Sequence, residues 1–169
     1  MIKYMNLIGI KARKASEYKV TTEVKNKVLN DYAKLIKNEK KYIINQNSKD
    51  INYARKKGLK ENLIKRLHLN ENKLDGIINS ILKIAKLRDP IDSTLEKWKR
   101  PNGLNIKRVS IPIGVIGVIY ESRPNVTSDV ASLCFKSGNV VILKGGSEAI
   151  NSNKALAKLF RKALKKNKV

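Results

Sequence analysis

The clearest structural pattern in the chain lies at residues 115–144, which read VIGVIYESRPNVTSDVASLCFKSGNVVILK. Two short apolar runs, at 115–119 and 140–143, have the length and composition of strands that are buried on both faces. Between them, residues 126–136 predict a helix, and Gly138 suits the left-handed conformation that often ends helices. The order strand, helix, strand therefore predicts a parallel βαβ unit with a right-handed crossover.

A second helix is predicted directly after this unit, at 152–166, where apolar side chains recur at helical spacing. In open parallel sheets, ligands bind beyond the carboxyl ends of the strands. The loops at 120–125 and 144–148 follow the two predicted strands and take that position. We therefore expect any ligand site of this chain to lie between these two loops.

The two loops contain side chains suited to anionic ligands. Arg123 offers a fork of donors for a carboxylate or phosphate, Asn125 offers an amide donor, and Lys144 offers a positive charge. Gly145 and Gly146 allow backbone to approach a ligand closely. The chain has neither a Walker A pattern nor a G-x-G-x-x-G motif. From the residues alone, the loops fit either a nucleotide-type site or ordinary turns.

The part of the chain before residue 100 predicts helices. Residues 24–36 and 74–85 each carry an apolar stripe at helical spacing, with Asn70 as the expected N-cap of the second helix. Shorter helical pieces are expected between them, interrupted by Asn-rich stretches and by Gly58. A proline at 90 ends the last helix, and residues 100–103 (RPNG) predict a turn. We therefore expect a helical N-terminal region at 1–100 and a separate α/β region at 101–169.

The charge of the chain has two explanations. The 169 residues contain 37 Lys and Arg against 14 Asp and Glu, a formal net charge of +23. Lys, Ile and Asn are abundant, and all three have A/T-rich codons, so a base-composition bias explains the excess without a basic function. A nucleic-acid-binding function is the alternative, but aromatic residues for stacking are scarce and the positive charge is spread along the chain. Nonspecific binding to polyanions at low salt is expected in either case.

The scarcity of metal-binding side chains excludes several site classes. A single Cys (Cys134) excludes an intrachain disulfide and a Cys-based zinc site, and a single His (His68) argues against a His-cluster metal site or a Ser-His-Asp triad. We expect His68 to be a packed or exposed side chain with no catalytic role. The longest uncharged stretch, 109–120, is too short to span a bilayer, and no secretory signal is expected at the N-terminus.

The stretch RVSIPIGVIGVIYESRPNVT at 108–127 closely resembles gamma-glutamyl phosphate reductase, a member of the aldehyde dehydrogenase superfamily. The resemblance continues through LCFKSGN at 133–139, ILKGG at 142–146, Glu148-Ala149 and Ser152-Asn153. NSKDI at 47–51 and several shorter upstream matches fit the helical N-terminal region of that family more loosely. The block YESRPNVT at 120–127 is specific to this family within the superfamily.

The resemblance implies a fold and a reaction. It implies an aldehyde dehydrogenase-like α/β fold, present here in truncated form: a helical N-terminal region followed by the first βαβα unit of a Rossmann-like, NADP-binding cofactor domain. The family reduces L-glutamyl 5-phosphate to L-glutamate 5-semialdehyde and phosphate with NADPH, in proline biosynthesis. A cysteine thiolate displaces the phosphate, and the cofactor then supplies a hydride. A cytoplasmic location, a homo-oligomer and no membrane association are implied as well.

The resemblance also implies roles for individual residues. Lys144, Gly145, Gly146 and Ser147 match the loop that meets the adenosine end of NADP(H), with Gly145-Gly146 in place of the superfamily's usual proline. Ser122, Arg123 and Asn125 match the active-site loop that follows the first strand. Arg123 is implied to bind an anionic group of the substrate, and Asn125 to stabilise a developing oxyanion.

One departure from the family pattern concerns the nucleophile. The chain is well under half the family's length, and the family's nucleophilic cysteine belongs downstream, so no catalytic residue is expected here. Cys134 lies in a predicted helix, and we expect it to be a packed core thiol. Three alternatives follow: the N-terminal portion of the reductase that is inactive alone, one half of a split enzyme with a complementing C-terminal half, or a basic nucleic-acid-binding protein. Apolar surface at 115–119 or 140–143 should be exposed and prone to aggregation.

Overall fold

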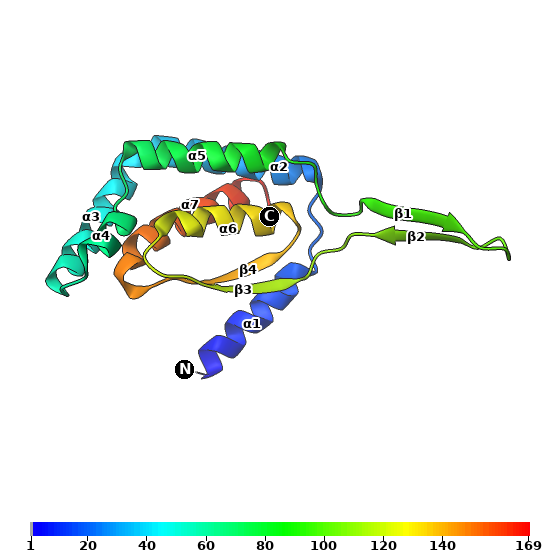
Figure 1. Cartoon of the computed structure of the whole chain (residues 1–169), viewed down its shortest axis with the longest axis horizontal. Coiled ribbons are helices and arrows are strands. Elements are labelled where there is room, and N and C mark those ends of the chain that lie inside the picture. Colours follow the sequence, from blue (N-terminus) through cyan, green and yellow to red (C-terminus); the bar gives the residue numbers. More distant parts are fainter. Residues whose placement is uncertain (1) are drawn as a thin grey trace.

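The computed structural model describes residues 2–169, apart from the side chain of Ile2. The predicted unit is present as strand β3 (Val115–Ile119), helix α6 (Pro124–Lys136), strand β4 (Val140–Lys144) and helix α7 (Ile150–Lys166), with a short 3-10 turn, η1 (Ser147–Ala149), before α7 (Figure 1). β3 and β4 are parallel, with Val115 opposite Val140 and Ile119 opposite Lys144. Gly138 has φ +69°, as the left-handed end of α6 requires. The βαβα order is thus confirmed.

The two strands are less buried than their apolar sequences predict. They form a sheet of two strands only, so each has one open edge. Most of their residues are intermediate in exposure, and Ile119 is 86% exposed. A strand is buried on both faces only where neighbouring strands and helices cover it. The expectation of exposed apolar surface on 115–119 is therefore confirmed at Ile119.

Five helices precede the sheet. They are α1 (Ile2–Ser16), α2 (Thr22–Asn38), α3 (Lys40–Lys56), α4 (Glu61–Leu67) and α5 (Glu71–Lys86). The predicted cap of α5 is confirmed, since the Asn70 side chain accepts a hydrogen bond from the Lys73 N–H at 2.9 Å. Gly58, with φ +68°, follows the end of α3. α3 differs from the short helical pieces that the sequence predicts here: its 17 residues form one continuous helix.

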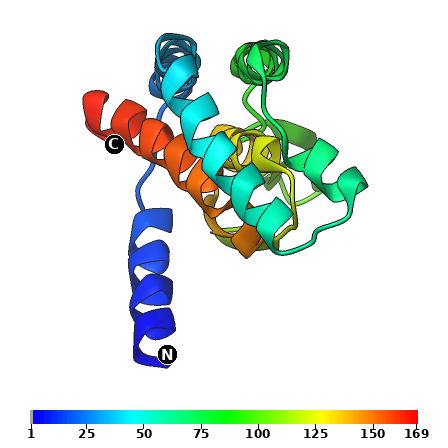
Figure 2. The same ribbon diagram turned by 90° about the vertical axis from the view of Figure 1, so that its left-hand side faces the viewer.

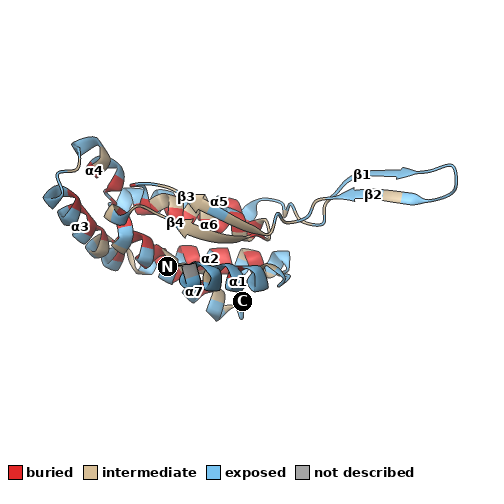
Figure 3. Ribbon diagram, turned by 90° about the horizontal axis from the view of Figure 1, so that it is seen from below, coloured by how far each residue is buried: buried red, intermediate tan, exposed pale blue. Residues whose placement is uncertain are grey.

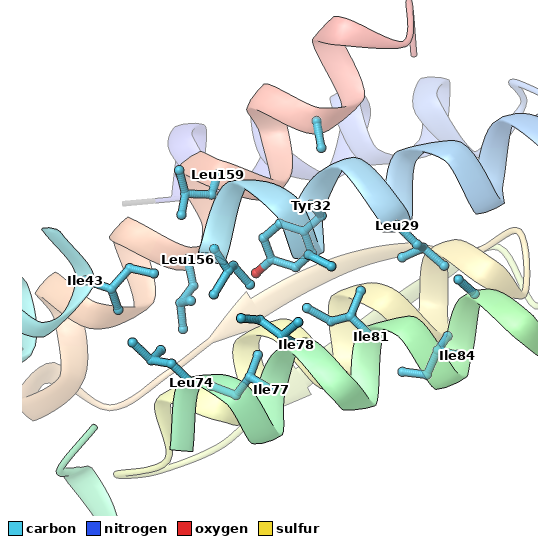
Figure 4. Packing of buried hydrophobic residues seen from close by; sticks show 14 of the residues in the cluster. Leu29, Tyr32, Ile43, Leu74, Ile77, Ile78, Ile81, Ile84, Leu156 and Leu159 are labelled. Carbon is cyan, nitrogen blue, oxygen red and sulfur yellow. The ribbon is translucent and has the colours of Figure 1, made fainter. Parts of the chain in front are cut away.

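The main core lies between α2, α5, α6 and α7 (Figure 4). Tyr32 of α2 is fully buried at its centre, and its ring meets Phe160 of α7 edge to face with centroids 5.0 Å apart. The Tyr32 hydroxyl pairs with the Ser128 hydroxyl of α6 at 2.7 Å, which satisfies both buried groups. Helices from before and after residue 100 therefore share one core, and the division at residue 100 stays a prediction.

Strands β1 (Thr94–Lys99) and β2 (Asn105–Val109) form an antiparallel hairpin that projects from the helical body (Figures 1 and 3). Only its turn at 100–103 was predicted. All of β1 and most of β2 are exposed, including Trp98 at 41%. Ser93 and Ser110 join the base of the hairpin through their hydroxyls at 2.8 Å.

Helix α1 stands apart from the other helices and contacts only β3 and β4 closely (Figure 2). It buries Ala12, whereas Tyr4, Leu7 and Ile10 are exposed. No helix in the described part of the chain has an apolar stretch long enough to cross a membrane.

Candidate cofactor and substrate site

The two predicted ligand loops lie side by side. Ile119 and Lys144 are register partners at the carboxyl ends of β3 and β4, and the Tyr120 N–H donates to the Lys144 carbonyl at 3.1 Å. The loop after β3 and the loop after β4 therefore leave the sheet at the same edge. The sequence-based prediction that these loops share one edge of a parallel sheet is confirmed.

A hydrogen bond joins the two loops. Ser122 is buried, 3% exposed, and its hydroxyl donates to the Glu148 carboxylate at 2.8 Å. Glu148 folds back over Gly146, where a Cβ would collide with its carboxylate. The Ser122 hydroxyl thus serves to connect the loops, and Gly146 provides the space in which Glu148 lies.

A row of hydrogen-bonded side chains lies beneath Gly145. The Tyr120 hydroxyl pairs with the Thr127 hydroxyl at 2.6 Å, and Thr127 in turn donates to the Asn153 amide oxygen at 3.0 Å. Burial raises the pKa of Tyr120, and the hydrogen bond with Thr127 opposes that shift only in part. A Cβ at Gly145 would collide with the Asn153 amide and the Tyr120 ring. Only glycine fits at 145 without moving this row.

Two positive charges border the loops. Lys144 and Arg123 are both exposed, and among residues 2–169 neither forms an ion pair. Ser147 is exposed beside them. Two unpaired cations suit a phosphorylated or carboxylated ligand, whereas the space beside Gly145 and Gly146 is filled by Asn153, Tyr120 and Glu148.

Asn125 lies in the first turn of α6 and is engaged within that helix. Its amide donates to the Asp129 carboxylate at 3.1 Å. Burial raises the pKa of Asp129, and the hydrogen bond from Asn125 opposes that shift. An oxyanion-stabilising role for Asn125 would require its amide to turn away from Asp129.

Cys134 is buried in α6, as expected. Burial raises the pKa of its thiol. A reactive cysteine needs a lowered pKa and exposure, so Cys134 has the properties of a structural thiol. Among the described residues there is no cluster of three or more His, Cys, Asp or Glu that would hold a metal.

Several residues that shape this region have no role that the sequence alone predicts. They are Tyr120, Thr127, Glu148 and Asn153, which enter only through the resemblance to a family. The available signal was the adjacent pair Gly145-Gly146, which indicates that side chains approach the backbone from both sides.

No family model matches the chain. Curated gamma-glutamyl phosphate reductases match it closely: the chain is 49% identical over 158 residues to that of Halothermothrix orenii, covering 90% of this chain and 38% of the relative. It is 52% identical over 143 residues to that of Aliarcobacter butzleri, covering 85% of this chain and 35% of the relative. The chain thus spans less than two fifths of the length of these relatives.

Solved structures give the same result. The crystal structure of gamma-glutamyl phosphate reductase from Thermotoga maritima matches with a TM-score of 0.89 and 43% identity, covering 92% of this chain and 38% of that one. The enzyme of that name from Saccharomyces cerevisiae matches with a TM-score of 0.90 and 32% identity, covering 95% and 41%. An acetylating aldehyde dehydrogenase from Geobacillus thermoglucosidasius matches at 16% identity with a TM-score of 0.62, covering 98% and 34%, and so shows the fold alone.

These findings confirm two predictions. The chain is similar to the N-terminal part of gamma-glutamyl phosphate reductases. Its fold is the corresponding part of an aldehyde dehydrogenase-like fold, with helices and a small sheet.

Proposed function

We propose that this chain, a relative of the N-terminal part of gamma-glutamyl phosphate reductases, contributes the first half of a cofactor-binding unit to such an enzyme. The enzyme would reduce L-glutamyl 5-phosphate to L-glutamate 5-semialdehyde with NADPH, in proline biosynthesis. The supporting observation is the 49% identity over 90% of the chain to a relative of that name, combined with two adjacent loops bearing unpaired cations.

The site assignments belong to this proposal. Lys144, Gly145, Gly146 and Ser147 would bind NADP(H), with Lys144 facing a phosphate or hydroxyl at its adenosine end. Among residues 2–169 the exposed amine of Lys144 has no ion-pair partner, and it fits such a group. The bound dinucleotide would supply the hydride.

Substrate contacts are proposed for the loop after β3. The exposed Arg123 would bind an anionic group of L-glutamyl 5-phosphate, and Asn125 would donate to the oxygen that gains charge during the reaction. Ser122 would act through Glu148, because its hydroxyl is bound to that carboxylate.

The division of the molecule is also part of the proposal. Residues 1–100 would form the helical N-terminal region and residues 101–169 a partial Rossmann-like NADP-binding domain. With Cys134 buried, the nucleophile would come from sequence outside these 169 residues, either in a longer chain or in a complementing half. The complete enzyme would be a cytoplasmic homo-oligomer.

The test is a titration of this chain with NADPH, monitored by nicotinamide fluorescence. We expect binding that weakens by about tenfold or more in Lys144→Glu, the loss of one charge-assisted contact to phosphate. Lys34→Glu, an exposed lysine on α2, is the matched control and should bind like the wild type. Equal binding by the wild type and Lys144→Glu would contradict the assignment of Lys144. No binding by the wild type would contradict a cofactor site within this chain.

A further inference from the structure

Helix α7 lacks an N-cap of its own. It begins directly after Ala149, whose side chain has no oxygen to accept from the first free N–H groups. Asp50, from the middle of α3, supplies the missing acceptor. One of its carboxylate oxygens accepts from the Asn151 N–H at 3.1 Å and the Asn151 side-chain amide at 2.8 Å. The other accepts from the Ser152 N–H at 2.7 Å and the Ser152 hydroxyl at 2.6 Å.

Asn47 completes this arrangement one turn earlier on α3. Its amide donates to the Ser152 hydroxyl at 3.0 Å and to the Leu67 carbonyl at 2.9 Å, and its oxygen accepts from the Leu69 N–H at 2.8 Å. Asn47 and Asp50 are each 1% exposed, and Ser152 is fully buried. A carboxylate so deeply buried is costly unless it is fully hydrogen-bonded, and here four donors satisfy it.

This arrangement fixes one end of the loop assigned to the cofactor. The loop leaves β4 at Lys144 and enters α7 through η1, a single 3-10 turn. Ala149, at the end of η1, is fully buried in a second apolar cluster with Ile51, Ala54, Ile64 and Leu67 of α3 and α4. The loop is therefore held at one end by the sheet and at the other by α3.

We propose that Asp50 is a positioning residue for the loop 144–148: it fixes the start of α7, and thereby the place where Glu148 meets Ser122 and where Gly145 and Gly146 present their backbone. The expected effect on cofactor affinity rests on the proposed function. The hydrogen bonds of Asp50 also determine which groups can hold an anionic ligand. Since Asp50 already occupies the N–H groups of Asn151 and Ser152, an anionic ligand of the loop is held by Lys144 and the glycine backbone, and not by the N-terminus of α7.

The test compares Asp50→Asn with Asp89→Asn in the whole chain. Asp89 is the matched control, because its carboxylate is also largely buried and accepts from three residues, Thr22, Lys25 and Ile91, remote from the loop. In Asp50→Asn we expect the amide signals of Gly145, Gly146 and Glu148 to shift or broaden in NMR spectra without ligand. We also expect NADPH affinity to fall by about tenfold, because the amide oxygen of Asn can accept from two of the four donors while its NH2 group opposes the other two. Asp89→Asn should leave both readouts unchanged.

Ser152→Ala keeps the test informative if Asp50→Asn fails to fold. It removes the hydroxyl between Asp50 and Asn47 but retains the Ser152 N–H bond, so it should shift the same amide signals by a smaller amount. Unchanged glycine signals in folded Asp50→Asn or in Ser152→Ala would overturn the proposal, as would equal changes in Asp89→Asn. If the wild type binds no NADPH, the proposed function fails, and the ligand-free amide signals still decide the positioning role.

Discussion

At the scale of single residues, the adjacent glycines of the loop after β4 differ in what surrounds them. Gly145 faces Asn153 and Tyr120, which belong to a buried hydrogen-bonded row, whereas Gly146 faces the end of the flexible Glu148 side chain. We expect Gly145→Ala to destabilise the chain by about 1–3 kcal/mol, because the row must move. Gly146→Ala should cost about 1 kcal/mol or less, since Glu148 swings into solvent and only its bond with Ser122 is lost.

Urea unfolding of the two alanine variants measures this difference. Ser122→Ala is the control for Gly146→Ala, because both remove the bond between Ser122 and Glu148. Equal unfolding free energies for Gly145→Ala and Gly146→Ala would show that Asn153 and Tyr120 are not held in place.

Lys25 and Asp89 form a buried ion pair, and its contribution to stability should depend on pH. Its atoms are 2.9 Å apart, and the side chains are only 4% and 11% exposed. Burial alone would raise the pKa of Asp89, but hydrogen bonds from Lys25, the Ile91 N–H and Thr22 outweigh burial and lower it. Because the pKa of Asp89 is lower in the folded than in the unfolded state, the ion pair stabilises the fold fully above the unfolded-state pKa, about 3.9. This stabilisation is lost as the pH falls through the folded-state pKa of Asp89.

Asp89→Asn leaves the Lys25 amine buried without its partner, so we expect a loss of about 3 kcal/mol at pH 7. The difference in unfolding free energy between wild type and variant should narrow as the pH falls below about 3.9, because Asp89 of the unfolded wild type is then protonated before Asp89 of the folded protein, whose pKa is lower. Chemical denaturation at pH 7 and at pH 3 gives both values. Asp75→Asn is the control, because its pair with Lys40 is 52% exposed at Asp75 and should contribute less than about 1 kcal/mol. A difference in unfolding free energy that is the same at pH 7 and pH 3 would contradict the lowered pKa of Asp89 in the folded protein.

At the scale of secondary structure, strong local signals made most elements predictable. β3, α6, β4 and α7 each combine an apolar pattern with a turn or glycine at their ends, and each lies close to its predicted position. α3 was underestimated because its buried face carries Asn47 and Asp50 beside Ile43, Ile51 and Ala54. Polar residues weaken an apolar stripe. The residue that Asn47 and Asp50 bind, Ser152, lies about 100 positions later in the sequence. The candidate loops were predictable from topology, but this contact was not.

The sequence does not predict the hairpin β1–β2, for a different reason. Both of its faces are exposed, so the sequence TLEKWK has no alternation of apolar and polar residues. An isolated two-stranded hairpin is only marginally stable in water. Its base is held by Ser93 and Ser110, while none of its residues belongs to either core cluster.

We therefore expect the hairpin to be energetically independent of the helical core. Replacing residues 94–109 by a short Gly-Ser linker should leave the thermal unfolding midpoint within a few degrees, because a change below about 1 kcal/mol shifts the midpoint of a domain of this size by less than about 4 °C. Circular dichroism measures the midpoint. Ile81→Ala, in the fully buried core, is the comparison and should lower the unfolding free energy by about 2–5 kcal/mol. A large loss in the linker variant would show that the hairpin supports the body.

At the scale of the whole molecule, the two-stranded parallel sheet lies beside an apolar cavity. A hollow of about 810 Å³ is lined by Val141 and Leu143 of β4, Phe135 of α6, Phe160 of α7 and the segment between α1 and α2. Both strands have an open edge, and open apolar edges favour pairing with further strands. The helices thus have a well-packed core, whereas the parallel sheet has two open edges beside an apolar hollow.

The net charge of +23 also acts at the scale of the whole molecule. A charge spread over the surface attracts nucleic acid through counterion release, without a groove-reading element or an array of aromatic side chains. We expect binding to duplex DNA at about 20 mM salt without sequence preference. The logarithm of the binding constant should fall linearly with the logarithm of salt concentration, and the Kd should be weaker than about 10⁻⁶ M at physiological salt. Fluorescence anisotropy with two unrelated duplexes measures it. Nanomolar, sequence-dependent binding at physiological salt would instead favour a nucleic-acid-binding protein, because diffuse charge alone gives neither that affinity nor that preference.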